Sequence, residues 1–503
     1  MTNARSQRSS RHARRAPFSR RNFLRWGSAA AAAAALPSVL SLRGPRASAQ
    51  PAADQKFLFV VTASGGGSII DSFLPVAASE AGAAGERIIA YPDAAIAQPS
   101  GSNLRVVRNL NLGGLFANAY DPATLLSKYY RDMLVVTVEN TSVNHVVAQK
   151  RAITGAGIDG GRTLMEAMAM QHGEGLLLPN ACLSVGGYAE PGDAEVPYSA
   201  RAEIVANPSL YALASHGYAG VGGAPSDTAM AQARAARERF DDASAFGQRY
   251  SQSALRARYL ELRRDLLPRI EEADLIHKLL LLQNGDDVSL SDYGLERSVE
   301  QDAQLARLLE VFPDVTHDRL HAQAALGFLL ARYGISSAVT LGPGFMPSFL
   351  EDGSIPDTPI AFDFSHTDHV TTQNTMWSRV CEVLDGLITL LEETPHGAGS
   401  MWDQSLIYVA TDFGRSKDRP SNAQSFSSGH HLNNGNLFIS PMLKGNRVYG
   451  GVDPTTALTY GFDPLTGTAD RNALMREGHL YSLVCQAMGI EFAGRHDMSG
   501  LVR

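Results

Sequence analysis

Acidic and imidazole side chains stand at the ends of several apolar runs in this sequence. Carboxylate oxygens and imidazole nitrogens together form a mixed ligand set that suits zinc or manganese. If the apolar runs are parallel strands, their carboxyl ends meet at one edge of a sheet, where open α/β sheets bind ligands. We therefore predict a divalent metal site, with one or two ions, at that edge. The candidate ligands are Asp71, Asp363, His366, His369, Asp412, His430 and His431.

Spacing along the chain bears on several of these candidates. Asp363 and His366 are three residues apart, as are His366 and His369, so one loop could bring them to the same ion. A surface turn rich in acid and histidine explains this spacing equally well. His430 and His431 are neighbours, and neighbouring side chains of an extended chain point apart. We therefore expect at most one of this pair to bind the metal.

Four further residues are candidates for catalysis. Thr141 and Ser142 carry hydroxyls that a nearby metal could activate as nucleophiles. His145 is a candidate base or ligand, although a lone histidine after a strand is more often structural. Arg415 offers a fork of donors for a tetrahedral oxyanion, and the alternative is a structural ion pair with Asp412.

A glycine run follows the first apolar run and precedes Asp71. It reads Gly65-Gly66-Gly67-Ser68. Consecutive glycines let the backbone approach a ligand and expose its N–H groups. No Gly-Lys-Ser/Thr follows, so a nucleotide-binding P-loop is not predicted. A tight turn is an equally good interpretation of the glycines.

The elements that must position these side chains alternate between strands and helices. Short apolar runs bounded by glycine and polar turns predict strands covered on both faces. An amphipathic helix is predicted over 371–393, where apolar residues repeat at three and four. This alternation predicts one α/β unit with a central, mostly parallel sheet. The predicted strands lie at 56–62, 133–138, 337–341, 405–410 and 436–440.

Residues 227–283 differ from the rest in composition. They are rich in Ala, Arg, Glu and Leu, and their first proline is Pro268. Leu255, Tyr259 and Leu262 begin a helical stripe. Two interpretations remain open: a helical insertion or cap over the α/β unit, or helices that cover one face of the sheet.

The first 49 residues predict an export signal. Residues 19–25 read Ser-Arg-Arg-Asn-Phe-Leu-Arg, an alanine-rich stretch follows, and Ala-Ser-Ala at 47–49 is a small-residue cleavage site. A membrane-spanning helix is disfavoured because the apolar part is short and broken by Pro37. We predict export by the Tat translocase to the periplasm or outside the cell, with no transmembrane helix in 50–503.

Removal of this signal makes the chain strongly acidic. The whole chain has 44 Lys+Arg against 51 Asp+Glu, a net charge of −7. Residues 1–49 hold ten arginines and no acid, so taking these ten away leaves −17 for 50–503. Such a surface repels nucleic acid and anionic lipid, and we predict a small anionic ester or an envelope component as the partner. The three cysteines, Cys182, Cys381 and Cys485, lack metal or redox spacing and are predicted to be buried and unreactive.

The order of these phrases resembles the DUF1501 family of twin-arginine-exported proteins, which is grouped with the alkaline phosphatase superfamily. The resemblance covers nearly the whole chain after the signal. It is most specific at 411–415 and 442–450. The matching phrases are Gly65-Gly66-Gly67, Asn144-His145, 361–366, 411–415, 428–431 and 442–450.

The resemblance implies an alkaline-phosphatase-like three-layer sandwich and two metal ions that clamp a phosphate or sulfate ester. Phe413 stands where the superfamily has a histidine after the aspartate, and Asn144 stands where the family has a serine. Ser68 stands where the family usually has an acid, three residues before Asp71. These departures leave the nucleophile unassigned and favour one metal, or none, over two. Two functions remain open: a metal-dependent hydrolase of such esters, and a non-catalytic envelope protein that acts in binding or assembly.

Overall fold

A computed structural model describes most of the chain after the predicted signal. The contacts divide the chain into two units, 1–48 and 49–503, and all described residues belong to the second. The predicted signal therefore lies outside the described residues. The described ranges are 51–112, 120–155, 161–184, 186–193, 195–215, 225–281, 297–344, 361–420, 423–491 and 495–503.

An eight-stranded sheet forms the centre of the described structure, in the order β14-β4-β13-β10-β1-β7-β5-β6. Among these strands, β13 runs antiparallel to both of its neighbours, and the other pairs are parallel. The five predicted strands are confirmed as β1, β4, β7, β10 and β13, and the short strands β5, β6 and β14 were not predicted. The bounds are β1 Phe57–Ala63, β4 Met133–Glu139, β5 Asn180–Cys182, β6 Glu203–Ile204, β7 Ala338–Leu341, β10 Ser405–Thr411, β13 Asn433–Ile439 and β14 Arg447–Tyr449.

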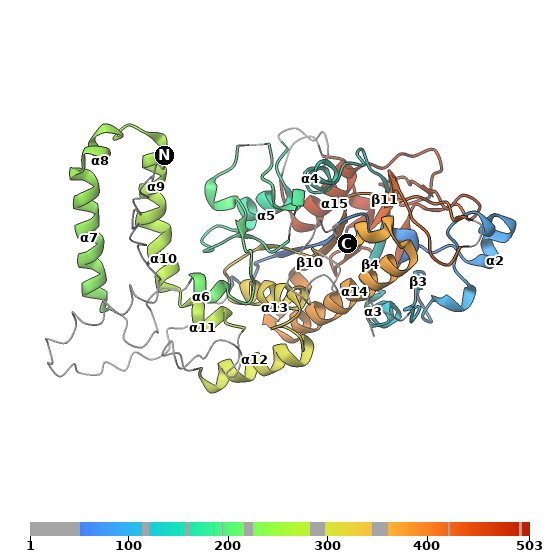
Figure 1. Cartoon of the computed structure of the whole chain (residues 1–503), viewed down its shortest axis with the longest axis horizontal. Helices are drawn as coiled ribbons and strands as arrows, with labels where there is room; N and C mark the ends of the chain where they lie inside the picture. The colour runs from blue at the N-terminus through green and yellow to red at the C-terminus, as the bar shows by residue number, and fades with distance from the viewer. Residues whose placement is uncertain are drawn as a thin grey trace, which may run out of the picture. The chain divides into compact units, whose positions relative to one another are not determined.

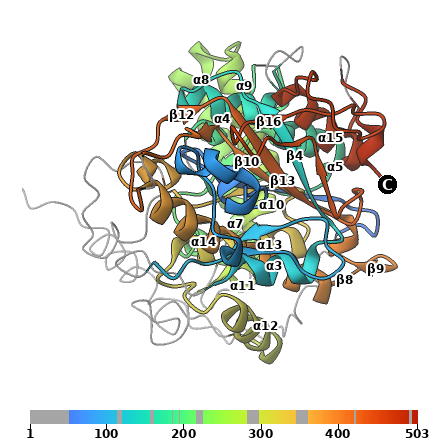
Figure 2. The same ribbon diagram turned by 90° about the vertical axis from the view of Figure 1, so that its right-hand side faces the viewer.

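Both faces of the sheet are covered by packed side chains. Phe57, Phe59 and Val61 of β1 belong to one apolar core, and Leu58 and Val60 belong to another. Successive side chains of a strand point to opposite faces, so the two cores lie on opposite sides of the sheet. Figures 1 and 2 show α3, α13 and α14 on one side and α4, α5 and α15 on the other. Their bounds are α3 Pro122–Tyr129, α4 His145–Thr154, α5 Leu164–His172, α13 Arg319–Arg332, α14 His369–Glu393 and α15 Glu477–Met488.

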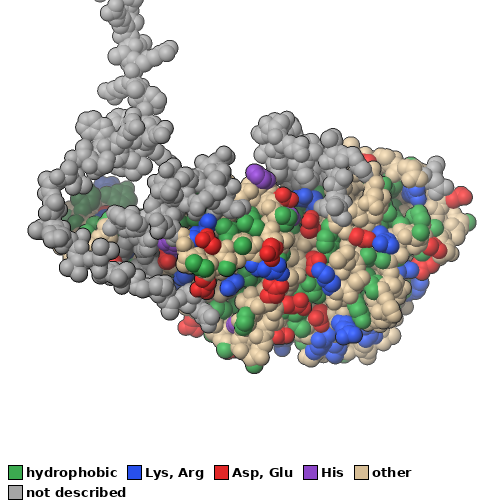
Figure 3. All heavy atoms as spheres, turned by 90° about the horizontal axis from the view of Figure 1, so that it is seen from below, with side chains coloured by type: hydrophobic (Ala, Val, Ile, Leu, Met, Phe, Trp, Pro, Cys, Tyr) green, Lys and Arg blue, Asp and Glu red, His purple; other side chains and the backbone are tan. Residues whose placement is uncertain are grey.

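The arrangement is therefore three layers, helices on a sheet on helices. This confirms the predicted α/β class with a central, mostly parallel sheet. The predicted helix 371–393 is confirmed as α14, which begins two residues earlier because Asp368 caps it by accepting from the N–H of Thr371. Acidic, basic and apolar side chains are interspersed over most of the face shown in Figure 3. No helix among the described residues has the length and apolar character needed to cross a bilayer.

The chain between Asp227 and Leu279 is helical. Figure 1 shows α7 standing beside α9 and α10, with α8 at their junction. The predicted end of this segment at 283 lies outside the described residues. The helices are α7 Asp227–Ala243, α8 Ala245–Arg249, α9 Ala254–Glu261, a π-helical turn at Leu262–Leu266, α10 Leu267–Glu272 and α11 Leu275–Leu279.

The remaining elements are short or peripheral. The three cysteines are free and buried, as predicted, and burial raises the pKa of Cys182 to about 11. Two of the short elements, β11 and β12, carry site residues. The bounds are α2 Ala78–Ala81, β2 Ile96–Ala97, β3 Val106–Val107, α6 Tyr211–Ser215, α12 Val299–Val311, β8 Pro395–His396, β9 Gly399–Ser400, β11 Gly414–Arg415, β12 His430–His431, β15 Gly451–Val452 and β16 Thr459–Tyr460.

Candidate metal centre

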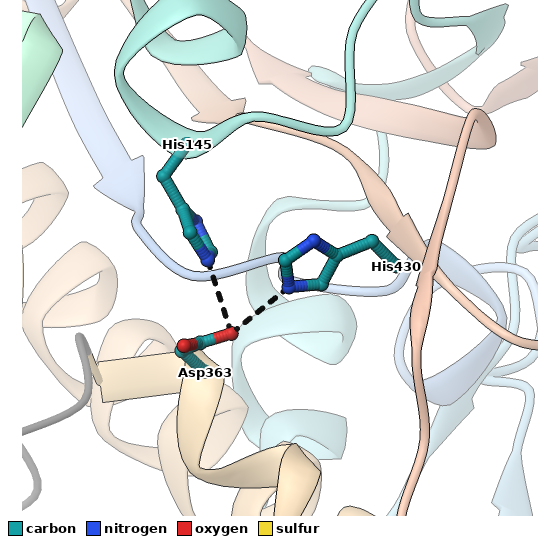
Figure 4. Close-up of side chains that lie close together, drawn as sticks. All are labelled: His145, Asp363 and His430. Atoms are coloured by element: carbon teal, nitrogen blue, oxygen red, sulfur yellow. Dashed lines mark hydrogen bonds and ion pairs between the residues drawn. The ribbon is translucent and has the colours of Figure 1, made fainter.

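Four side chains from three distant segments meet beyond the carboxyl ends of β4 and β10; we call them the outer cluster. They are His145, Asp363, His366 and His430. Oδ1 of Asp363 lies 3.2 Å from Nε2 of His145, 3.2 Å from Nε2 of His366 and 3.3 Å from Nε2 of His430. The Nε2 atoms of His366 and His430 are 2.8 Å apart. Figure 4 shows the rings of His145 and His430 pointing at the Asp363 carboxylate from different elements.

The start of α4 positions His145, which is the first residue of this helix. Asn144 caps the helix, because its side chain accepts from the N–H of Val147 at 3.2 Å. Nδ1 of His145 lies 2.8 Å from Oδ2 of Asp412, which follows β10 directly. Asn144 therefore acts as the helix cap that presents His145.

A two-stranded ladder positions His430. Arg415 of β11 pairs with His430 of β12, and Gly414 pairs with His431. Paired residues of a ladder project to the same face, whereas neighbours along a strand project to opposite faces. Nδ1 of His430 lies 2.9 Å from the carbonyl oxygen of Val143. As expected for neighbours in extended chain, one residue of the histidine pair enters the cluster.

The glycine run binds an anion that belongs to the chain itself. The N–H groups of Gly65 and Gly66 donate to the buried carboxylate of Asp412 at 3.1 and 2.6 Å. A Cβ atom at Gly65, where φ is +94°, would lie 2.3 Å from the backbone nitrogen of Asp363. The run thus brings η9, the 3₁₀ helix Ala361–His366 that carries Asp363, close to β1. Asp412 was predicted as a metal ligand. Its carboxylate instead accepts from the glycine run and contacts Nδ1 of His145, which is the nitrogen that faces away from Asp363.

Hydrogen bonds on the far side of each ring decide where the protons lie. The carbonyl of Val143 only accepts, so Nδ1 of His430 carries a hydrogen, and the Asp412 carboxylate imposes the same on Nδ1 of His145. The Nε2 atoms of the neutral rings then present lone pairs to Oδ1 of Asp363. Oδ1 of Asp363 accepts from Arg415, but each imidazole lone pair that faces it meets another acceptor, and a proton or a metal cation between the two stabilises that contact.

The pKa values reflect this arrangement in the absence of a metal. Burial lowers the pKa of His145, but hydrogen bonds and charge from Asp363 and Asp412 outweigh it and raise the value to about 9. Burial raises the pKa of Asp363, but His145, His430 and Arg415 hold it well below its ordinary value. Burial and the charge of Arg415 lower the pKa of His366. The site therefore attracts positive charge, and a metal bound there would compete with the proton on His145.

The spacing of the ligand atoms also fits a metal ion. Bonds of about 2.0–2.1 Å to a tetrahedral zinc separate neighbouring ligand atoms by roughly 3.3 Å. The three nitrogen–oxygen distances of 3.2, 3.2 and 3.3 Å match that separation. One ligand atom each from His145, Asp363 and His430 lie within 4.8 Å of one another. Metal-bound histidines usually donate their other ring N–H to an acceptor that orients the ring. Asp412 is such an acceptor for Nδ1 of His145, and the Val143 carbonyl is one for Nδ1 of His430.

Asp71 and His369 lie in a second group, the inner cluster, with Tyr91, Lys417 and Ser428. Oδ1 of Asp71 accepts from the Tyr91 hydroxyl at 2.6 Å and lies 3.1 Å from Nε2 of His369. Nδ1 of His369 lies 2.8 Å from Oγ of Ser428, so both of its ring nitrogens are engaged. The side chains of Asp71 and His369 are 0 % exposed. These two predicted ligands contact each other, outside the outer cluster.

His431 and the predicted catalytic hydroxyls are engaged elsewhere. Nδ1 of His431 accepts from the N–H of Asn433 at 3.1 Å. Oγ1 of Thr141 lies 2.9 Å from Oε1 of Glu477, and Oγ of Ser142 accepts from the N–H of Asn144 at 3.1 Å. The outer cluster thus contains three of the predicted ligands together with His145, and neither hydroxyl is in it.

Arg415 is fully buried, and backbone groups hold its guanidinium. Nη2 lies 2.6 Å from Oδ1 of Asp363 and 3.3 Å from the Phe362 carbonyl, and it also donates to the Gly65 carbonyl. Nη1 donates to the Ser428 carbonyl at 3.3 Å. Arg415 forms an ion pair, but its partner is Asp363 and not Asp412, the partner considered from the sequence. Asp412 accepts from the glycine run instead.

Three buried amide side chains that the sequence did not single out support the site. Gln373 accepts from the N–H of Ser68 at 2.9 Å and donates to the Gly66 carbonyl at 3.0 Å. Asn434 accepts from the N–H of Ile69 at 2.9 Å. Gln149 lies 3.4 Å from Oδ2 of Asp412. Asn434 had a signal in the sequence, because three asparagines stand directly before the apolar run Leu437–Ile439.

The fold and the site define a three-layer α/β protein with a candidate metal centre at the carboxyl edge of its sheet. Residues 17–37 match the family described as "TAT (twin-arginine translocation) pathway signal sequence". The chain is thus exported by the Tat translocase across the cytoplasmic membrane, to the periplasm or beyond, as predicted. No curated protein matches the chain.

The chain is also similar to a solved structure described as "Crystal structure of Ps i-CgsB in complex with k-i-k-neocarrahexaose". The identity is 10 %, the similarity covers 87 % of this chain and 72 % of the other, and the TM-score is 0.29. At that TM-score the likeness carries no functional inference.

Proposed function

We propose that this exported chain is a divalent-metal-dependent hydrolase of small phosphate or sulfate esters. One observation carries the proposal: Nε2 of His145, Nε2 of His430 and Oδ1 of Asp363 face one another around a point that suits a cation. The resemblance to the DUF1501 family, and through it to the alkaline phosphatase superfamily, provides the class of substrate. The position beyond the strand ends agrees with the usual place of ligand sites in open α/β sheets.

In this proposal His145, Asp363 and His430 hold one zinc or manganese ion. When bound, such an ion lowers the pKa of a coordinated water to near 7 and polarises an ester oxygen, by analogy with known sites. Asp412 keeps the proton of His145 on Nδ1, so that Nε2 faces the ion. We propose a single ion because Asp71 and His369, two further buried candidate ligands, contact each other in the inner cluster and do not reach the outer cluster.

Water is the nucleophile that we propose, because Thr141 and Ser142 bond to Glu477 and Asn144 respectively. His366 is the proton acceptor in this scheme. Its side chain is 45 % exposed, and its lowered pKa keeps the imidazole neutral near pH 7. A neutral, accessible imidazole beside the ligands is suited to remove a proton from an attacking water.

The test is metal analysis and ester hydrolysis with protein purified after export. We expect about one zinc or manganese ion per chain and hydrolysis of aryl phosphates or sulfates that chelation abolishes and metal restores. Asp363→Asn replaces the charged carboxylate with a neutral amide of nearly the same volume and is expected to lose both the metal and the turnover. Asp470→Asn, in an exposed turn, is the matched control and retains both. Metal-free wild-type protein without turnover of either ester would contradict the proposal.

A second function is a non-catalytic envelope protein whose metal stabilises the fold. The observation in its favour is the burial of Arg415, whose guanidinium contacts Asp363 and backbone carbonyls. This arginine is therefore not available to orient the anionic group of a substrate. Tight binding of one metal ion without hydrolysis of any aryl phosphate or sulfate, whichever metal is supplied, would favour this second function.

A further inference from the structure

The arm formed by α7, α8, α9 and the π-helical turn Leu262–Leu266 turns its large apolar side chains outward near the junction of these helices. Phe240 is 72 % exposed, Phe246 68 % and Leu255 84 %, and Tyr250 and Tyr259 are also exposed. None of the 17 residues of α7 is buried. Exposed apolar patches of this kind mark surfaces that contact a partner or a membrane.

Ion pairs link the helices of the arm. Arg264 pairs with Glu238 at 3.3 Å and Arg256 with Asp242 at 3.1 Å. Arg263 also pairs with Asp241. Two packed helices normally bury their apolar stripes against each other and expose their charges. In this part of the arm, ion pairs link the helices while the large apolar side chains are exposed, so these side chains can contact another surface.

The same part of the arm has a positive charge in an acidic chain. Residues 237–258 contain five arginines against Glu238, Asp241 and Asp242, a net charge of +2, whereas 50–503 as a whole carry −17. Each of these three acids is paired with an arginine of the arm. The exposed Arg237, Arg239 and Arg249 have no ion-pair partner among the described residues.

We propose that this junction, residues 237–259, docks on the surface of an anionic lipid bilayer. Aromatic and leucine side chains flanked by arginines are typical of segments that lie in the headgroup region of a membrane. The three arginines without partners would meet lipid phosphates, and export by the Tat translocase passes the chain through a membrane. A second copy of the chain is a poorer fit at the junction itself, because two such junctions would bring unpaired arginines together.

The test is sedimentation of the mature chain, residues 50–503, with vesicles of phosphatidylglycerol or of phosphatidylcholine. We expect partition into phosphatidylglycerol vesicles, weakened by salt, and little into phosphatidylcholine. Replacing Arg237, Arg239 and Arg249 by Gln should weaken partition about fivefold each, and roughly a hundredfold together. Phe240→Ser with Phe246→Ser should weaken it by about tenfold or more.

The control is Leu465→Ser with Leu474→Ser, which changes two exposed leucines outside the arm and should leave partition unchanged. Wild-type protein that does not partition into phosphatidylglycerol, or arm variants that bind as well as wild type, would overturn the proposal. So would a wild-type dimer that dissociates in the double phenylalanine variant and binds no lipid, because a second copy would then be the partner. Ester hydrolysis should be equal in all variants, so this result is separate from that of the proposed function.

Discussion

The outer and inner clusters use the same residue types in different ways. In the outer cluster, Nδ1 of His145 and of His430 each has an acceptor behind it, so both Nε2 atoms face one carboxylate oxygen. In the inner cluster, Ser428 and Asp71 occupy both ring nitrogens of His369. The side chains of Asp363 and His430 are partly exposed, at 17 and 22 %, whereas those of Asp71 and His369 are 0 % exposed.

This difference shows what turns acids and histidines into a ligand set. A histidine can bind a metal when one ring nitrogen is held by an acceptor and the other is left with a lone pair. The ion must also be able to enter from solvent. His145 and His430 are partly exposed and meet the second condition. His369 fails it because its side chain is 0 % exposed, although all three histidines lie near acids in the same part of the fold.

The largest expected effect separates the carboxylates of the two clusters. Asp363→Asn should weaken metal binding by more than about a hundredfold, because it replaces the charged carboxylate that three imidazoles face with a neutral amide. Asp71→Asn should retain the metal but lower the free energy of unfolding by about 3–5 kcal/mol, because buried partners lose their carboxylate. Mass spectrometry of bound metal and urea unfolding measure the two effects. Metal loss in Asp71→Asn, with retention in Asp363→Asn, would reverse the assignment of the clusters.

The inner cluster should also give stability a distinct pH dependence. Burial lowers the pKa of Lys417 from 10.5 to about 8, with Asp71 opposing the shift. Between these values the unfolded state holds more protons than the folded state, so stability rises with pH by up to about 3 kcal/mol.

Lys417→Met keeps an apolar stem in place and should remove this rise. Urea unfolding at the two ends of the range, in wild type and variant, isolates the contribution because other groups cancel in the difference. If the free energy of unfolding rose equally with pH in both proteins, the pKa of Lys417 would be the same in the folded and unfolded states, and the prediction would be wrong.

A smaller effect is expected where Asp412 supports His145. Asp412→Asn can still accept from the glycine run but orients Nδ1 of His145 poorly, and metal affinity should fall about 10- to 100-fold. His369→Asn, the matched change in the inner cluster, should leave metal affinity within about twofold while lowering stability. Competition with a chromophoric chelator measures both affinities. Equal losses in the two variants would mean that the clusters are not independent.

The smallest effect is expected at the histidine pair of β12. His431→Ala should change metal affinity by less than about twofold and stability by about 0.5 kcal/mol, because this ring projects away from the cluster. His430→Ala removes a ligand and should weaken metal binding by at least about tenfold. Chelator competition on both variants tests the direction assigned to each ring. Similar losses would place both histidines at the ion.

Much of the fold follows from local patterns. The apolar runs that became β1, β4, β7, β10 and β13 are recognisable because strands covered on both faces need continuous apolar sequence. The strands β5, β6 and β14 are two or three residues long and carry no such signal. At 227–279 the helices were predicted, but the outward direction of Leu255 and Tyr259 was not, because a stripe does not reveal what it faces.

The order of residues alone determined the export signal, the acidic charge and the strands and helices, because each depends on neighbours along the chain. It also brought acids and histidines to the strand ends. Only the tertiary structure decided which of them meet, because His145, Asp363 and His430 come from segments far apart in sequence. The partner of each Nδ1 atom and the burial of His369 depend on groups from other segments, which no spacing records.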